Sequence, residues 1–442
     1  MSAWIIQSLL RLRASYYFLP ALMCLGAILL AIVTTLIDLR YQAEVRDILG
    51  WFFASTVDSA RSVLTTIAGS MISVAAVTFS LTMVAVTTAA GQYGPRLIGN
   101  FMRDRANQIT LGMFLATFLY CMVVLKSVSE EITINAHNTV GVSPSLSVLV
   151  ALVLTLISVC VLIFFVHHIP ETLNVGNITG NVSKGLIGQI EQGRFPIAEN
   201  VETINDANLE DPFDPNLTQV IHCETSGYIQ AVSLKGMRDW AQDNHCQLRL
   251  LSVPGDFTMQ GDPLVEITPD KTSETLDQDR FRQEKATDVL SFVAIGQERT
   301  AHQNILFLAD ELVEIAARAL SPGINDPFTA INCIHWYSDI CLSMINSDTA
   351  LNCVVDRQGK PRIWANSVGF ETVCEKLFGQ SRQYVCEDEN TAREALKVLY
   401  RLKKRASDLN ENAIDDQITR YQKAIEQSKL GESQKARLNG EP

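Results

Sequence analysis

Four long apolar segments dominate the first 168 residues of the chain, and polar residues separate them. They cover about residues 17–37, 64–90, 109–125 and 146–166, and none contains Lys, Arg, Asp or Glu. Each is close to the roughly 17–25 apolar residues that cross a bilayer as a helix. Because a backbone in lipid must satisfy its own hydrogen bonds, the pattern predicts a bundle of four transmembrane helices over residues 1–168.

Lys and Arg near the ends of these segments indicate the orientation. With the N-terminus inside the cell, the inner basic residues are Arg11, Arg13, Arg96, Arg103 and Arg105, and the outer ones are Arg40, Arg46, Arg61 and Lys126. The inner side has a small excess, and an even number of helices returns the chain to the side where it began. We therefore expect a multi-pass protein of the inner (plasma) membrane with both termini in the cytosol.

The rest of the chain has the pattern of an α+β cytosolic domain. Residues 169–215 predict an amphipathic exit helix and a linker, and residues 216–300 predict a small β-rich unit. The strand-like SGYIQAV and the turns PGDF and QGDPL follow one another in a rhythm that resembles the barrel-sandwich fold of biotinyl and lipoyl carriers. No lysine lies between Lys235 and Lys271, so the covalent carriage of those proteins is not expected.

Helical periodicity prevails from residue 301 to residue 428. Ile305, Leu308 and Leu312 begin an apolar face, Ser321-Pro322-Gly323 ends that helix, and a second helix starts near Pro327. Asn325 or Asp326 can cap the second helix, which predicts a helical hairpin with a defined corner. Three further helices are expected before residue 428. The polar residues 429–442 predict a disordered tail.

Composition and charge support this division and exclude several classes of protein. Apolar residues make up 47% and charged residues 19%, below the quarter that is usual for soluble chains. The first 168 residues carry 9 Lys and Arg against 7 Asp and Glu, whereas the remainder carries 27 against 41. This argues against a wholly soluble enzyme, a disordered protein and a nucleic-acid binder. Ten scattered cysteines without a C-x-x-C pair predict free thiols.

The second apolar segment differs from the others because hydroxyl side chains run through it. Ser73, Ser80 and Thr87 are seven residues apart and fall on one stripe, with Ser70 beside it. Small and hydroxyl residues permit close helix–helix contact, so the stripe suits a packing seam. It equally suits the hydroxyl-lined face of a pore in an oligomer. Ion-coupled carriers usually place charges at membrane depth, and these segments have none.

The loop between the second and third segments, Gly91 to Arg105, combines a Gly94-Pro95 turn with basic residues. Arg96, Arg103 and Arg105 accompany the apolar Leu97, Ile98 and Phe101. Such a segment can lie against anionic lipid, or it can dock on the acidic cytosolic domain.

Motifs of known chemistry are missing from the sequence. It has no phosphate loop, no dinucleotide-binding glycine pattern, no H-E-x-x-H and no G-x-S-x-G. Asp310, Glu314 and His302 could bind a metal or carry out acid–base chemistry. However, Glu314 and Arg318 also have the spacing of an ordinary helical ion pair. We therefore expect no metal and no cofactor, and an enzymatic activity is the least favoured of the functions considered.

Several segments resemble a bacterial family of predicted integral membrane proteins, catalogued as domain of unknown function 2254. They are TIAGSMI (66–72), YGPRLIGNFMRDR (93–105), SGYIQ with PGDF, and above all RALSPGINDPFTA (318–330). The resemblance extends from about residue 15 to about residue 402. It implies a bacterial inner-membrane protein with this layout, and it supplies no activity, substrate or catalytic residue.

Three functions follow, in order of preference. The first is a homo-oligomeric pore or channel-like protein, lined by the second helix and regulated by the cytosolic domain. The second is a non-conducting membrane scaffold that binds a cytosolic protein partner. The third is a membrane-tethered enzyme that uses Asp310, Glu314 and His302. No nucleic acid is expected as a partner in any of them.

Overall fold

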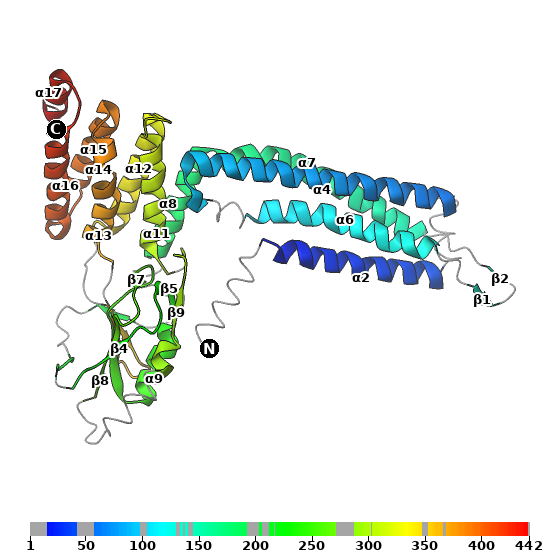
Figure 1. Cartoon of the computed structure of the whole chain (residues 1–442), viewed down its shortest axis with the longest axis horizontal. Helices are drawn as coiled ribbons and strands as arrows, with labels where there is room; N and C mark the ends of the chain where they lie inside the picture. The colour runs from blue at the N-terminus through cyan, green and yellow to red at the C-terminus, as the bar shows by residue number, and fades with distance from the viewer. Residues whose placement is uncertain are drawn as a thin grey trace. The chain divides into compact units, whose positions relative to one another are not determined.

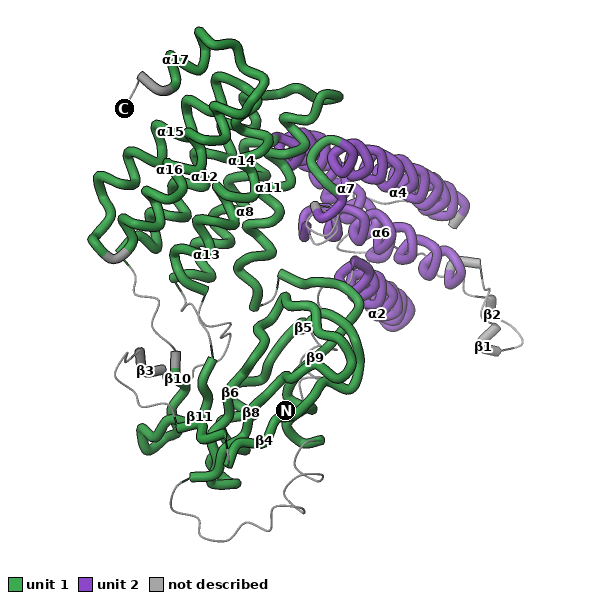
Figure 2. The backbone as a smooth tube through the Cα atoms, turned by 60° about the vertical axis from the view of Figure 1, so that its left-hand side comes forward, with its two compact units in different colours: residues 1–10, 92–94, 175–442 green, residues 11–91, 95–174 purple. Residues whose placement is uncertain are grey.

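The structure is a computed structural model, and it divides into two compact units. Residues 11–91 and 95–174 form the N-terminal unit, and residues 175–442 with 92–94 belong to the C-terminal unit (Figure 2). The residues that the structure describes are 16–41, 57–97, 104–129, 133–135, 138–139, 145–191, 203–205, 212–215, 217–270, 287–301, 303–346, 352–365 and 368–440.

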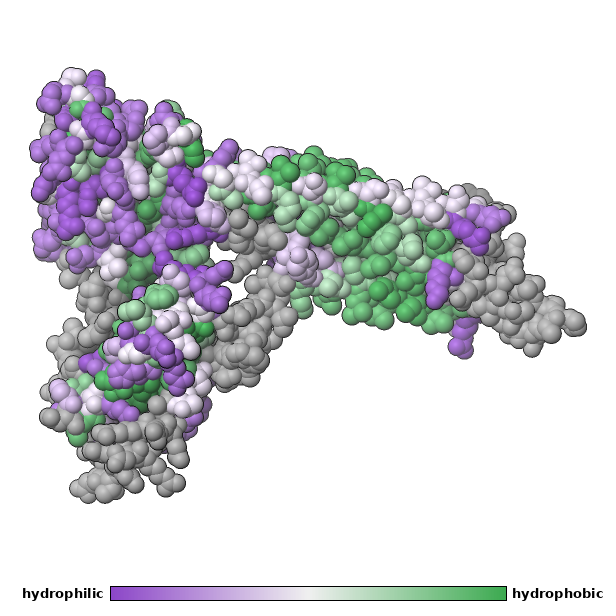
Figure 3. Space-filling model, in the orientation of Figure 1, coloured by the Kyte–Doolittle hydropathy of each residue, from purple (hydrophilic) through white to green (hydrophobic). Residues whose placement is uncertain are grey.

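Four long helices that lie side by side make up the N-terminal unit (Figure 1). They are α2 (Phe18–Arg40), α4 (Val57–Tyr93), α6 (Arg105–Ser129) and α7 (Ser145–Leu173). All four are long and apolar enough to cross a membrane, as the sequence predicted. Apolar side chains cover much of the surface that Figure 3 shows over them. The unit also contains η1 (Pro95–Leu97), β1 (Thr133–Asn135) and β2 (Asn138–Thr139).

Small residues bring the long helices together. Ala27 and Ala31 of α2 are buried in a core shared with α4, α6 and α7. On α6, a Cβ added at Gly112 would lie 2.7 Å from Met23 Sδ and 3.1 Å from Pro20 Cα of α2, so a larger residue would force Met23 to move. In a bilayer the hydrophobic effect does not drive helices together, so close packing of this kind stabilises their association.

Helices build one part of the C-terminal unit. Helix α8 (Val175–Glu191) packs against the hairpin of α11 (Ile305–Ala319) and α12 (Pro327–Met344). The exit helix and the helical hairpin are therefore confirmed. The helices that follow are α13 (Phe370–Cys374), the π-helical turn η2 (Glu375–Gly379), α14 (Gln380–Val385), α15 (Glu389–Lys403), α16 (Asp408–Gln427) and α17 (Glu432–Gly440).

Two sheets and α9 (Leu234–Asp243) build the other part. A mixed six-stranded sheet has the order β3-β10-β11-β6-β8-β4, and a three-stranded sheet has the order β7-β5-β9. The strands are β3 (Thr203–Asn205), β4 (Gln219–His222), β5 (Gly227–Val232), β6 (Cys246–Leu250), β7 (Phe257–Thr258), β8 (Pro263–Pro269), β9 (Val293–Gly296), β10 (Asn352–Val355) and β11 (Pro361–Ala365). Strand pairing is antiparallel except between β11 and β6. The barrel-sandwich resemblance stays a prediction.

The larger sheet is not confined to residues 216–300, where the sequence placed the β-rich unit. The hairpin β10–β11 follows α12 in the chain, yet Ile363 of β11 pairs with Leu248 of β6. Ile363, Trp364 and Ala365 are all buried. Its buried side chains indicate that this hairpin must join a larger sheet. The local sequence does not identify which strand it pairs with.

The predicted disorder of residues 429–442 is also wrong over most of its length. Helix α17 occupies Glu432–Gly440, and Leu438 is buried. Gln434 Nε2 and Arg437 Nη2 donate to a Glu389 carboxylate oxygen on α15, over 2.9 and 3.1 Å. The prediction rested on the polar composition of this segment. Burial of Leu438 and the two hydrogen bonds to Glu389 stabilise the helix against its neighbours.

Candidate functional site

Helix α4 has two unlike faces along its 37 residues. Its buried face is mainly apolar, with Leu64, Met71 and Val86, and it also contains Thr78 and Thr82. Its exposed face carries every member of the predicted hydroxyl stripe, Ser70, Ser73, Ser80 and Thr87. The structure thus brings the four together, on the side of α4 that faces away from the other described helices of the N-terminal unit.

The exposed hydroxyls of Ser70, Ser73 and Thr87 are hydrogen-bonded within their own helix. Ser73 Oγ donates to the Gly69 carbonyl over 2.8 Å, and Thr87 Oγ1 donates to the Met83 carbonyl over 2.8 Å. Each hydroxyl oxygen keeps its capacity as an acceptor. Small residues recur along this face at alternating intervals of three and four, namely Thr66, Gly69, Ser73, Ala76, Ser80, Thr87 and Ala90, with Met83 as the one larger member. This is the spacing by which helices pack as left-handed pairs.

A buried carboxylate ties three helices together at one end of the bundle. Asp38 of α2 is 1% exposed and accepts from Leu146 N over 3.0 Å, from Ser147 N over 2.9 Å and from Ser147 Oγ over 2.6 Å. It therefore caps the N-terminus of α7 from another helix. Beside it, Tyr120 of α6 shares a hydrogen bond with Thr34 and donates to the Ser147 carbonyl. This geometry suits a structural cap.

Asp104 and His168 form a polar contact where α6 begins. His168 Nε2 lies 2.6 Å from Asp104 Oδ2, and Asp104 Oδ1 accepts from Ala106 N. The His168 ring stacks on Phe164. Of the predicted docking arginines, Arg96 and Arg105 are exposed, and Arg103 lies outside the described residues.

The corner between α11 and α12 is tightly hydrogen-bonded. Asp326 is the N-cap of α12, because its carboxylate accepts from Thr329 N over 3.1 Å and from Thr329 Oγ1 over 2.5 Å. Asp326 N donates to the Ala319 carbonyl, and Ser321 Oγ donates to the Arg318 carbonyl. The predicted cap is thus confirmed at Asp326, and Pro327 takes the first helical position. The remaining corner residues, Pro322, Gly323 and Asn325, are exposed.

Replacing Asp326 with alanine should destabilise the C-terminal unit by about 1 kcal/mol, the usual cost of losing an N-cap acceptor. The shift in the thermal unfolding midpoint of the full chain in detergent measures this loss. Asp326→Asn keeps an acceptor oxygen and should retain most of the stability. Equal midpoints for the wild type and the alanine variant would contradict the capping role.

The carboxylates of the predicted acid–base group are engaged in ion pairs. Asp310 contacts Arg299 Nη1 over 2.5 Å and Lys376 Nζ over 2.6 Å, and Glu314 contacts Arg318 Nε over 3.2 Å. His302 lies outside the described residues. Within the described part of the chain, no group of three or more His, Cys, Asp or Glu could hold a metal ion. These contacts fit a structural role for Asp310 and Glu314.

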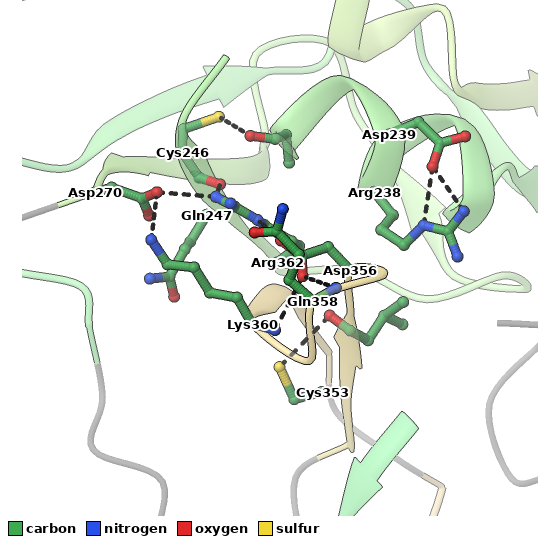
Figure 4. A network of polar contacts seen from close by, with 12 residues as sticks. Arg238, Asp239, Cys246, Gln247, Asp270, Cys353, Asp356, Gln358, Lys360 and Arg362 are labelled. Atoms are coloured by element: carbon green, nitrogen blue, oxygen red, sulfur yellow. Dashed lines mark hydrogen bonds and ion pairs between the residues drawn. The ribbon is translucent and has the colours of Figure 1, made fainter. Parts of the chain in front are cut away.

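A buried ion network in the six-stranded sheet is absent from the sequence predictions (Figure 4). Arg362 donates to Asp356 Oδ2 over 2.8 Å, to Asp270 Oδ2 over 3.0 Å and to the Cys246 carbonyl. Lys360 Nζ also lies 2.6 Å from Asp270 Oδ2. Burial alone would raise the pKa of each carboxyl, but the hydrogen bonds from Lys360 and Arg362 outweigh it and lower both pKa values. The network joins the β10–β11 turn to the end of β8.

Comparison with known proteins gives the family. A family described as predicted membrane protein (DUF2254) matches residues 13–401. The chain belongs to this family. The resemblance seen in RALSPGINDPFTA and the other segments is thus confirmed, and with its four candidate spans this member of the family is a membrane protein.

The curated relatives of this family member carry no assigned activity. Uncharacterised proteins from Mycobacterium tuberculosis and Mycobacterium bovis are 28% identical to it over 391 residues, which cover 88% of this chain and 72% of each relative. No solved structure matches the chain.

Sequence reasoning missed two groups in this family member, Asp38 with its partners and the network around Arg362. The predicted first helix ended at Ile37, one residue short of Asp38. An acidic residue at the edge of an apolar segment, followed far along the chain by a serine-rich helix start at 145–147, is the only signal for this cap. Arg362 has no comparable signal, since its two partners lie in different strands and turns.

Proposed function

We propose that this protein is a homo-oligomeric, pore-forming or channel-like protein of the bacterial inner membrane. In this proposal both termini lie in the cytosol, and the C-terminal unit regulates the pore. The observation that carries the proposal is the outward position of the hydroxyl face of α4. A single chain leaves this face without a helix against it among the described residues, so further copies of the chain would supply its surroundings.

The contrast with the other helices supports this proposal. Helices α2 and α7 expose large apolar side chains such as Leu29 and Leu156, which suit contact with lipid tails. The outward surface of α4 also exposes apolar residues such as Leu81 and Phe79, but a stripe of small and hydroxyl residues runs between them. Lipid contact gains nothing from hydroxyl groups, whereas water and neighbouring helices can hydrogen-bond to them.

The length of α4 is a second supporting feature. Its 37 residues span about 55 Å, well beyond the roughly 30 Å of hydrocarbon. A helix of this length extends out of the bilayer, and Gln92–Gly94 at its end belong to the C-terminal unit. A movement of the C-terminal unit can therefore be transmitted to α4 directly, which is what regulation of a pore requires.

A non-conducting scaffold is the second candidate, and one observation favours it. Ser70, Ser73 and Thr87 already donate to carbonyls of their own helix, and Gly69 and Ala76 lie on the same face. Such a surface permits two α4 helices to pack closely without leaving a lumen. In that case the C-terminal unit would bind a cytosolic protein partner.

The mass of the purified protein in detergent, corrected for bound detergent, separates these functions. We expect a ring of three or more copies, because two copies of α4 leave little room for a central path. A monomer or a dimer would contradict the pore and favour the scaffold.

Substitution of the stripe then tests conduction in liposomes. Ser73→Leu and Ser80→Leu should lower potassium efflux about tenfold. This corresponds to a free-energy barrier to permeation that the apolar side chains raise by about 1.4 kcal/mol. Cys160→Leu, an exposed position on α7, is the matched control and should leave efflux unchanged. Equal efflux in all variants, or none in the wild type, would contradict the pore.

A further inference from the structure

The corner between α11 and α12 presents large apolar side chains to its surroundings. Phe328 is 78% exposed, the highest value for a large apolar side chain in the described part of the chain, and Ile324 is 42% exposed. Pro322 beside them is also exposed. We refer to Pro322, Ile324 and Phe328 as the apolar corner. An exposed cluster of this kind usually marks a contact with another molecule or with a membrane.

The backbone beneath the apolar corner is held in place. Asp326 caps α12 and its own N–H donates to the Ala319 carbonyl over 2.7 Å, while Ile324 N and Asn325 N both donate to the Ser321 carbonyl. Thr329 and Ala330, next to Phe328, are buried. The apolar side chains are thus presented at fixed positions, so a contact made through them costs little ordering of the backbone.

Helix α8 shows where the apolar corner lies within the C-terminal unit. Gln189 near the end of α8 donates to the Ala301 carbonyl, just before the start of α11. Thr179 near the start of α8 donates to Asn332 Oδ1 over 2.9 Å, in the first turns of α12. Helix α8 therefore runs antiparallel to α11, and its first residue lies at the end of the helical layer that carries the apolar corner.

The chain passes from its membrane-spanning helices into the C-terminal unit at that same end. Helix α8 begins at Val175, two residues after the candidate span α7 ends at Leu173. Gly94, which directly follows α4 and belongs to this unit, is close to the last turns of α11, because a Cβ added there would lie 2.8 Å from Glu314 Cδ. Two segments that follow candidate spans directly in the chain thus lie toward the end with the apolar corner.

From this placement we propose that Pro322, Ile324 and Phe328 insert into the headgroup region of the bilayer that the chain spans. The occupant of this surface is lipid, not a protein. Phe328 and Ile324 gain by leaving water for the acyl boundary. Arg318, in the last turn of α11 just before the corner, pairs with Glu314 and is a basic residue near this end that could meet lipid phosphates. The C-terminal unit would then hold the membrane at a third point, besides its two covalent connections to α4 and α7.

Tryptophan fluorescence of the full chain in vesicles tests this proposal. Phe328→Trp and, separately, Ile324→Trp are reconstituted in phosphatidylcholine–phosphatidylglycerol vesicles, with and without bromine near the headgroup end of the acyl chains. After subtraction of the wild-type signal, we expect the added tryptophan to emit at shorter wavelength than in water. Brominated lipid should remove at least half of its signal.

The matched control is Phe257→Trp, another exposed aromatic position of the same unit. Phe257 is 57% exposed, and the neighbouring Gly255 approaches Asn304, the N-cap of α11. It therefore lies near the opposite end of α11, about 22 Å from the apolar corner by helix rise. Its added signal should be insensitive to brominated lipid.

Two results would overturn the proposal. Water-like emission at residues 324 and 328, unaffected by bromine, would show that the apolar corner stays in water. Short-wavelength emission that bromine does not quench would show that a protein surface, such as a second copy of the chain, covers it. The two variants replace exposed side chains, so a folding defect in one leaves the other as a readout.

Discussion

Arg362→Met should destabilise the C-terminal unit by about 3–5 kcal/mol, because it removes the cation that pairs with the buried Asp356 and one of the two cations that pair with Asp270. Arg362 is only 4% exposed and contacts both Asp356 and Asp270, which are themselves buried (Figure 4). Methionine preserves the apolar bulk of the side chain but donates no hydrogen bond. Denaturant unfolding of the full chain, followed by tryptophan fluorescence, measures the loss.

The same variant should change how stability depends on pH. In the wild type, the pKa values of Asp270 and Asp356 are lowered below those of the unfolded chain. Their contribution is therefore present above about pH 4 and is lost as the pH falls through the lower values of the folded state. Without Arg362, burial should raise both pKa values, so protonation relieves the buried charge. The difference between the wild type and Arg362→Met should then shrink from pH 7 to pH 4.

Lys360→Met is the matched control for this network. Lys360 contacts the same Asp270 oxygen, but its side chain is 41% exposed and Arg362 remains in place. We expect a loss of at most about 1 kcal/mol, as for ion pairs near the surface. An equal loss for the two variants would contradict the central role assigned to Arg362.

Asp38→Ala should destabilise the helix bundle by about 2–3 kcal/mol, because it removes the acceptor of three hydrogen bonds at the start of α7. The amides of Leu146 and Ser147 would lose their partners in a region where little water can replace them. The favourable position of a negative charge at a helix N-terminus is lost as well. The thermal unfolding midpoint in detergent is the measurement.

Asp38→Asn removes the negative charge but keeps a hydrogen-bond acceptor, so it separates the contributions of the two to stability. The amide oxygen can still accept from the start of α7, so this variant should retain more stability than Asp38→Ala. Identical midpoints for the wild type and the alanine variant would mean that Asp38 is not a structural cap.

Much of the helical architecture was predictable because its signals are local. The four apolar segments specify membrane helices, since length and hydropathy alone decide whether a segment can cross hydrocarbon. The corner at residues 321–327 was predictable for the same reason, because Pro, Gly and a capping Asp act on the backbone next to them. The hydroxyl stripe of α4 followed from helical periodicity.

The remaining features depended on contacts between residues far apart in the chain. Hydroxyl spacing places Ser73 and Ser80 on one face of α4, but only the packing of α2, α6 and α7 decides that this face points outward. The position of β11 is defined by its pairing with β6, and the position of α17 is defined by its hydrogen bonds to Glu389.

The sequence by itself determined the four spans, the division into two parts, the capped corner and the family. The tertiary structure decided which face of α4 is exposed, which carboxylates are paired, and that Phe328 lies uncovered at the corner. The physical reason is that hydropathy, capping and turn preferences act over a few residues. Burial and ion pairing depend on which distant segments meet.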